Sequence, residues 1–313
     1  MRIRIAHETV YRYDRPAKGL IQALRLTPRD HDGQHVRHWR IEPSADGLLR
    51  RDEDTFGNLM HLFSADGPVE ELVIRVVGEV ETHETHGVVR GAVERLPDLF
   101  YLRDTALTDA DEPIRAFAAE AAGDLSRDPL SGLHRLLAAI HAGVTFDTRP
   151  TQSTTTAAEA FALRRGVCQD LTHIFIAGAR HLGIPARYVS GYLHRADGVT
   201  EQEAGHAWAE AKVPHLGWVG FDPANGISTG EAYIRIATGL DYLGAAPVRG
   251  SRYGGGAETL KVRLTVEDAP VQTQSLGHGM VQRQGSPGQP ATQSQEPGTG
   301  QVQRQGSQVQ SQG

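Results

Sequence analysis

Three side chains of this 313-residue sequence could together carry out nucleophilic chemistry: Cys168, His206 and Asp222. Cys168 is the only cysteine, and it lies two residues after Gly166 at the start of a segment with helical spacing of apolar residues. A helix N-terminus presents unpaired N–H groups and partial positive charge, which favours a thiolate over a thiol. The same N–H groups can bind the oxyanion of a tetrahedral intermediate. A lone cysteine is more often a small buried apolar residue, so its position is what makes Cys168 a candidate nucleophile.

His206 and Asp222 lie on two consecutive segments that are predicted to form a β-hairpin, residues 204–213 and 218–222. If the numbers of residues paired across this hairpin add to an even value, the two side chains share one face and lie within reach of each other. An odd sum would place them on opposite faces. An aspartate that accepts a hydrogen bond from one imidazole nitrogen would leave the other nitrogen facing a thiol.

The remaining elements are predicted from hydrophobic periodicity. Residues 1 to about 90 alternate apolar and polar side chains between turn-forming segments, which is typical of half-buried antiparallel strands. Helical spacing predicts helices at 113–122, 129–142, 156–163 and 166–183, the third with a capping box formed by Thr156 and Glu159. Strands are expected at 186–193 and, returning to a sheet, at 258–266. The Gln/Gly/Ser/Pro-rich residues beyond about 269 are predicted to be disordered.

Two stretches of the sequence resemble a known family. GVCQDLTHIFIAGARHLGIPARYVSGYL, which contains Cys168, is followed by GHAWAEAKVPHLGWVGFDPANG, which contains His206 and Asp222. Both are similar to the bacterial transglutaminase-like family, within the superfamily of papain-like thiol enzymes. The resemblance extends over residues 1 to about 267, including FGN at Phe56–Asn58 in the β-rich start.

The resemblance implies an α+β fold, with a papain-like transglutaminase core preceded by an antiparallel β-sandwich. The expected organisation is a β-sandwich at 1–90, a linker at 91–107, a catalytic core with a return strand at 108–267 and a disordered tail at 268–313. Cys168, His206 and Asp222 fall on the family's catalytic residues, which implies a cysteine protease, amidase or acyltransferase acting through a thioester. The expected partner is a peptide or protein amide substrate, and no cofactor or metal is expected. Water and an amine remain equally acceptable as the group that discharges the thioester.

Two alternatives stay open. The family usually has a histidine at the position of Tyr233 and an arginine at that of Leu240, so the chain could be a catalytically silent scaffold that binds a peptide or a partner enzyme. Fifteen histidines raise the further alternative of a metal-dependent hydrolase. The sequence contains no HExxH motif and no second cysteine, which argues against a zinc site.

Composition excludes several other classes. A formal net charge of −6 disfavours binding to nucleic acid, which usually needs a concentrated basic face. No apolar run approaches the roughly 18 residues of a membrane span, and no signal peptide is expected at the start. One cysteine allows no disulfide within the sequence. We therefore expect a cytoplasmic protein that binds neither nucleic acid nor membrane.

Overall fold

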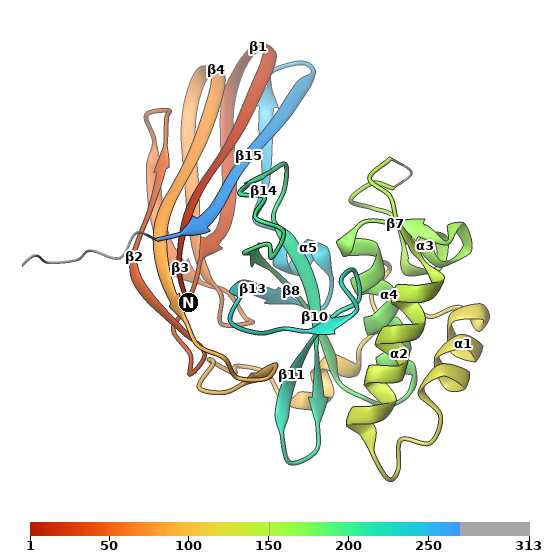
Figure 1. Ribbon diagram of the computed structural model, residues 1–313. Helices are drawn as coiled ribbons and strands as arrows, with labels where there is room; N and C mark the ends of the chain where they lie inside the picture. The colour runs from red at the N-terminus through yellow and green to blue at the C-terminus, as the bar shows by residue number, and fades with distance from the viewer. Residues whose placement is uncertain (150, 270–313) are drawn as a thin grey trace, which may run out of the picture. The chain divides into compact units, whose positions relative to one another are not determined.

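The computed structural model describes residues 1–149 and 151–269, and these form a mixed α+β fold (Figure 1). The predicted disordered tail lies outside the described residues. No helix within the described ranges is both long enough and apolar enough to cross a membrane.

Two long strands dominate the first third of the chain and run antiparallel side by side (Figure 1). The strands of this region are β1 (Arg2–Thr27), β2 (Gln34–Pro43), β3 (Leu48–Glu53) and β4 (Leu59–Thr82). The register between β1 and β4 is interrupted between Arg12 and Gly19. Apolar residues from both sides of this break, including Leu24, Phe63, Leu72 and Ile74, pack into one core. The alternating pattern therefore buries one side chain in two, as predicted for half-buried strands.

The C-terminal part of the described chain completes this sheet. β14 (Val248–Gly254) pairs with the second half of β1, and β15 (Glu258–Asp268) pairs with its first half. The short β9 (Glu201–Gln202) extends the sheet beyond β15. The return strand predicted at 258–266 is confirmed, and the β-rich region is thus built from both ends of the described chain.

Four helices follow in the middle of the chain, each starting at a recognisable signal. They are α1 (Glu112–Ala122), α2 (Pro129–Gly143), α3 (Ala157–Leu163) and α4 (Cys168–His181). The side chains of Asp111 and Asp128 cap α1 and α2, and each helix has a proline in its first turn. Thr156 and Glu159 form the predicted capping box of α3.

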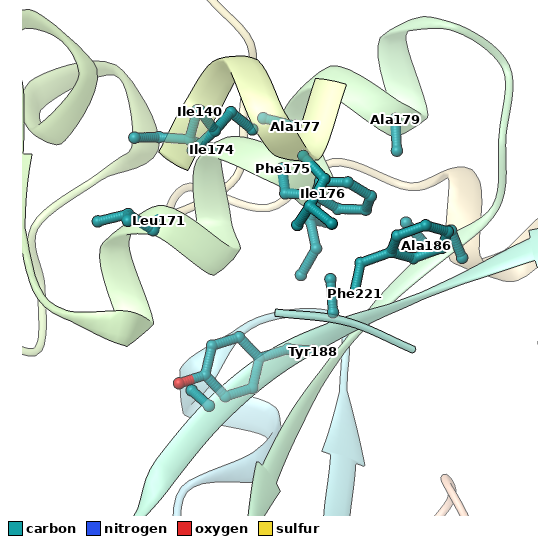
Figure 2. Packing of buried hydrophobic residues seen from close by; sticks show 14 of the residues in the cluster. Ile140, Leu171, Ile174, Phe175, Ile176, Ala177, Ala179, Ala186, Tyr188 and Phe221 are labelled. Carbon is teal, nitrogen blue, oxygen red and sulfur yellow. The ribbon is translucent and has the colours of Figure 1, made fainter. Parts of the chain in front are cut away.

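A second sheet packs against these helices on the side of β8 and β10 (Figure 1). Its strands run in the order β12-β11-β10-β8-β13, with β5 beside β11. Their bounds are β5 (Val88–Val89), β8 (Ala186–Leu193), β10 (His206–Val213), β11 (Gly217–Asp222), β12 (Ile227–Ser228) and β13 (Tyr233–Gly239). Phe175 of α4 stacks on Phe221 of β11 with 5.1 Å between the ring centroids, whereas Ile174 lies beside Ile140 of α2 (Figure 2). This apolar contact fixes the start of α4 relative to β10 and β11.

The remaining short elements join these parts. They are the 3-10 helix η1 (Asp98–Leu102), the parallel pair β6 (Thr145–Phe146) and β7 (Arg165–Gly166), and α5 (Tyr242–Ala245). Residues 91–107, which the sequence predicts as a linker, contain η1 with the side chain of Tyr101 fully buried. The backbone carbonyl of Tyr101 accepts a hydrogen bond of 3.0 Å from the buried Arg180. This segment is therefore packed against α4.

Candidate active site

Cys168 is the first residue of α4 and is partly exposed. The helix start is held by Asp170, whose Oδ2 accepts hydrogen bonds from the backbone N–H of Val167 at 2.8 Å and from Thr151 Oγ1 at 2.7 Å. Gly166 leaves room for this carboxylate, because a Cβ atom there would lie 2.6 Å from Asp170 Oδ2. Asp170 therefore acts as a cap for the N-terminus of α4.

The hairpin formed by β10 and β11 has the register that places His206 and Asp222 on one face. Ala209 pairs with Phe221 and Glu210 with Gly220, so the paired numbers have an even sum. Extending this register puts Asp222 opposite Trp208 and diagonal to His206. His206 Nε2 and Asp222 Oδ2 are 2.6 Å apart. The imidazole is thereby oriented, and Nδ1 is the ring nitrogen left for the thiol.

Asp222 is fully buried and its carboxylate is surrounded by hydrogen-bond donors. Besides His206, Oδ2 accepts hydrogen bonds from Asn225 Nδ2 at 2.7 Å and from the Tyr233 hydroxyl at 2.8 Å. Oδ1 accepts from the backbone N–H groups of Ala224 at 3.0 Å and Asn225 at 3.2 Å. Burial alone would raise the pKa of Asp222, but the hydrogen bonds and positive charge of His206, with the bonds from Asn225 and Tyr233, lower it. Asp222 is therefore held as a carboxylate.

His206 links the thiol to this carboxylate. Burial acts to lower its pKa, but hydrogen bonds to Asp222 and Cys168 and the negative charges of both groups outweigh burial and raise the pKa to about 10. The ring therefore carries its proton at neutral pH when the thiol is ionised. Its side chain is only 12% exposed, so water screens these interactions weakly.

A second group of buried polar residues lies behind Cys168. Tyr188 is 2% exposed, and burial followed by the nearby Cys168 raises its pKa well above the ordinary value of a tyrosine. Its ring packs against that of His173, with 5.2 Å between the ring centroids. Burial lowers the pKa of His173 to about 4, and its Nε2 accepts a hydrogen bond of 3.1 Å from the backbone N–H of Tyr242. Tyr188 is thus both part of the core (Figure 2) and a neighbour of the thiol.

Sequence reasoning did not assign a role to Asn225, although a turn signal was present. Asn225 follows Asp222 and Pro223. A strand that ends in Asp-Pro, with an asparagine three positions after the aspartate, is typical of a turn stabilised by side chains.

The alternative of a metal-dependent hydrolase finds no support in the structure. Residues 1–149 and 151–269 contain no group of three or more His, Cys, Asp or Glu side chains suited to binding a metal ion.

Comparison with known proteins agrees with this architecture. Residues 3–81 match the bacterial transglutaminase-like N-terminal region, and residues 115–223 match the transglutaminase-like superfamily. The uncharacterized protein ML0607 of Mycobacterium leprae is 32% identical over 281 residues, which cover 85% of this chain and 98% of that protein. This chain belongs to the bacterial transglutaminase-like family. The uncharacterized protein Rv2569c of Mycobacterium tuberculosis is 29% identical over 303 residues, covering 88% and 95% of the two chains.

A solved structure extends the likeness to the fold. The crystal structure named "a Putative Cysteine Protease from Cytophaga hutchinsonii" aligns with a TM-score of 0.68 at 19% identity, covering 86% of this chain and 92% of that one. The two chains thus share one fold over 86% of this chain.

The two departures from the family pattern have different structural consequences. Tyr233 reaches Asp222 with its hydroxyl, so a hydrogen-bond donor to the carboxylate is retained where the family usually has histidine. At Leu240 it is the backbone that is engaged, because its carbonyl accepts a hydrogen bond of 2.7 Å from Arg180 Nη2.

Proposed function

We propose that this transglutaminase-like chain is a cysteine enzyme that cleaves or transfers amide acyl groups through a thioester on Cys168. The observation that carries the proposal is the position of His206, which interacts with Cys168 and with the buried Asp222. A cysteine made nucleophilic by a histidine that a third group orients is the general arrangement of nucleophilic catalysis. The substrate is a peptide or protein amide, and its conversion takes place in the cytoplasm.

In the first half of the reaction, the thiolate of Cys168 attacks the amide carbonyl carbon and a carbon–sulfur bond forms. The carbonyl oxygen becomes an oxyanion, which the free N–H groups of the first turn of α4 can stabilise. The carbon–nitrogen bond then breaks as the protonated His206 gives its proton to the leaving amine. The products of this half are a free amine, a thioester and a neutral imidazole.

In the second half, water or an amine attacks the thioester. The neutral His206 accepts the proton of the attacking group, and Cys168 leaves as a thiolate. Water yields a carboxylic acid and an amine yields a new amide. Asp222 stays ionised throughout and holds the ring in its working orientation and tautomer.

The thiolate–imidazolium pair can be tested without knowing the substrate. Because Cys168 is the only cysteine, the mass added by iodoacetamide reports on this residue alone. We expect rapid labelling at pH 6, about 2 units below the range in which ordinary thiols become reactive. The measurement is the labelling rate from pH 5 to 9 by intact-protein mass spectrometry, with Cys168→Ala as the control for non-specific addition.

The same measurement separates the proposal from the catalytically silent scaffold. Labelling that rises only above about pH 8, like that of a free thiol, would favour the scaffold and count against the proposal. Activity-based profiling with a panel of peptide amides, comparing the wild type with Cys168→Ala, then identifies the acyl donor. Adding a primary amine to the same reactions distinguishes transfer from hydrolysis by the mass of the product.

A further inference from the structure

The β-rich region contains a cavity of about 500 Å³ that involves none of the candidate catalytic residues. One wall comes from β2, with Val36, Trp39 and Ile41. Further lining residues come from β3 and the start of β4: Arg51, Leu59 and His61. This volume lies within the usual range of small-molecule sites, about 300–1,000 Å³.

The apolar wall of the cavity is held in place by its surroundings. Trp39 donates a hydrogen bond of 2.8 Å from Nε1 to the backbone carbonyl of Leu26. Its ring lies over Gly78, where an added Cβ would come within 2.1 Å of it. The wall is therefore preformed, which reduces the ordering cost of binding a ligand.

Three polar atoms of residues that line the cavity are buried and lack a hydrogen-bond partner within the described part of the chain: Thr27 Oγ1, Arg29 Nε and His61 Nδ1. Buried polar groups in native proteins are nearly all hydrogen-bonded, so each exception needs an explanation. The residues that line the cavity therefore carry more polar groups than they have internal partners.

Charge at the cavity favours an anion. Arg51 is exposed, and no carboxylate among the described residues lies within ion-pairing distance of it. Arg29 also lines the cavity; it forms an ion pair with Glu53 through Nη2, and its side chain remains 25% exposed. Asp30 is the acidic residue of the lining, and its carboxylate accepts a hydrogen bond from the backbone N–H of Val36 at 2.7 Å.

We propose that this cavity binds a carboxylate attached to an apolar body, such as an N-acylated amino acid or the C-terminal residue of a peptide. The carboxylate lies against Arg51 and Arg29, and the apolar body packs on Trp39. A guanidinium is well suited to this task because its planar donors match the geometry of a carboxylate. The site does not depend on the thiol chemistry, so it can stand if the proposed function fails.

Calorimetric titration of the full chain, in the wild type and in Cys168→Ala, tests the site. The probes are N-acetylphenylalanine, its amide, and a tetrapeptide ending in phenylalanine with a free or an amidated C-terminus. We expect each free acid to bind about tenfold or more tightly than its amide, and equally in both proteins. Binding of the single amino acid alone identifies a free acid as the ligand, whereas tighter binding of the tetrapeptide identifies a peptide terminus.

Arg51→Gln and Arg50→Gln form a matched pair, because Arg50 is its exposed neighbour on β3 and does not line the cavity. We expect Arg51→Gln to weaken binding of the acids about tenfold and Arg50→Gln to leave it unchanged. Thermal melting of both variants checks that they fold. Absence of binding up to about 10 mM, equal binding of acid and amide, or equal loss in both variants would overturn the proposal.

Discussion

At the scale of single residues, the ionisation of the candidate site depends on how Asp222 is held. Five hydrogen bonds converge on this carboxylate, from His206, Tyr233, the side chain and backbone of Asn225, and the backbone of Ala224. A buried acid without such donors would take up a proton, and it would then no longer stabilise an imidazolium. The tyrosine that departs from the family pattern is thus part of the set of groups that keeps the site charged.

Asp222→Asn tests the role of this charge. Asparagine has nearly the same shape, but it does not stabilise a protonated His206. We expect the rate of Cys168 alkylation at pH 6 to fall about tenfold to hundredfold, since a neighbouring charge shifts a pKa by roughly 1–2 units. The exposed Asp46→Asn is the control, and an alkylation profile equal to that of the wild type would contradict the assigned role.

Tyr233→Phe tests the donor that sequence comparison alone left in doubt. Removing a hydrogen bond to a charged group costs about 1.5–3 kcal/mol, so we expect a lower melting temperature and an alkylation profile shifted to higher pH. Tyr233→His, which restores the residue usual in the family, should retain much of the wild-type profile. Tyr253→Phe is the control because Tyr253 is 71% exposed. Identical profiles for the Phe variants at the two positions would show that the Tyr233 hydroxyl has no electrostatic role.

At the scale of elements, the position of the thiol depends on where α4 begins. The turn from Gly166 to Asp170 closes on itself through the hydrogen bond between Val167 N and Asp170 Oδ2. Because Cys168 lies inside this turn, any change in the cap moves the sulfur relative to His206. The helix cap therefore acts as a positioning device for the candidate nucleophile.

Gly166→Ala should displace this turn. The new Cβ would lie within 2.6 Å of the Asp170 side chain, which is itself buried and cannot move away freely. We expect lower thermal stability together with slower alkylation of Cys168 at pH 6. Gly143→Ala at the end of α2 is the control, since its nearest contact would be 3.8 Å from Arg164. If Gly166→Ala lowered stability while leaving alkylation unchanged, the cap would be structural only.

At the scale of the whole molecule, buried histidines make the fold sensitive to acid. Burial lowers the pKa of His7, His31 and His173 to about 4 each. His7 contacts Tyr192 through a hydrogen bond of 2.8 Å and thereby joins β1 of the larger sheet to β8 of the smaller one. In the unfolded chain these rings take up protons near pH 6.5, so the unfolded state binds more protons than the folded state between about pH 6.5 and 4.

The sign of the pH dependence follows from this difference. Stability should fall as the pH drops from about 6.5 to about 4, by about 2–3 kcal/mol for each buried histidine. The raised pKa of His206 acts in the opposite direction, because its contribution is present below pH 6.5 and is lost as the pH rises toward about 10. Scanning calorimetry should therefore show a melting temperature that passes through a maximum between about pH 4 and about pH 10 and falls toward both values.

His7→Gln should make the acid arm of this profile shallower. Glutamine does not titrate, whereas its amide can still hydrogen-bond to Tyr192. The control is His86→Gln, because the side chain of His86 is 92% exposed. An acid arm as steep in His7→Gln as in the wild type would show that His7 does not contribute to it.

Local patterns in the sequence were enough to predict the parts of the site that lie close together along the chain. The helical stripe after Gly166 predicted Cys168 at a helix N-terminus, and the alternation on both sides of residues 214–217 predicted the hairpin that carries His206 and Asp222. These predictions succeed because helix caps and hairpin registers are set by interactions over a few residues. The sequence motifs around Cys168, His206 and Asp222 resemble those of the family and predicted the fold class, which the comparisons confirm.

Only the tertiary structure decided the contacts made by residues from strands that are not neighbours in the chain. Tyr233 reaches Asp222 although β13 pairs with β8 and not with β11, so its role depends on the order of strands in the sheet. In the same way, β14 and β15 pair with β1 although they lie more than 200 residues away in the sequence. The cavity beside Trp39 is lined by residues of β2, β3 and β4. Strand order follows from the burial of whole apolar faces at once, which no local pattern of residues encodes.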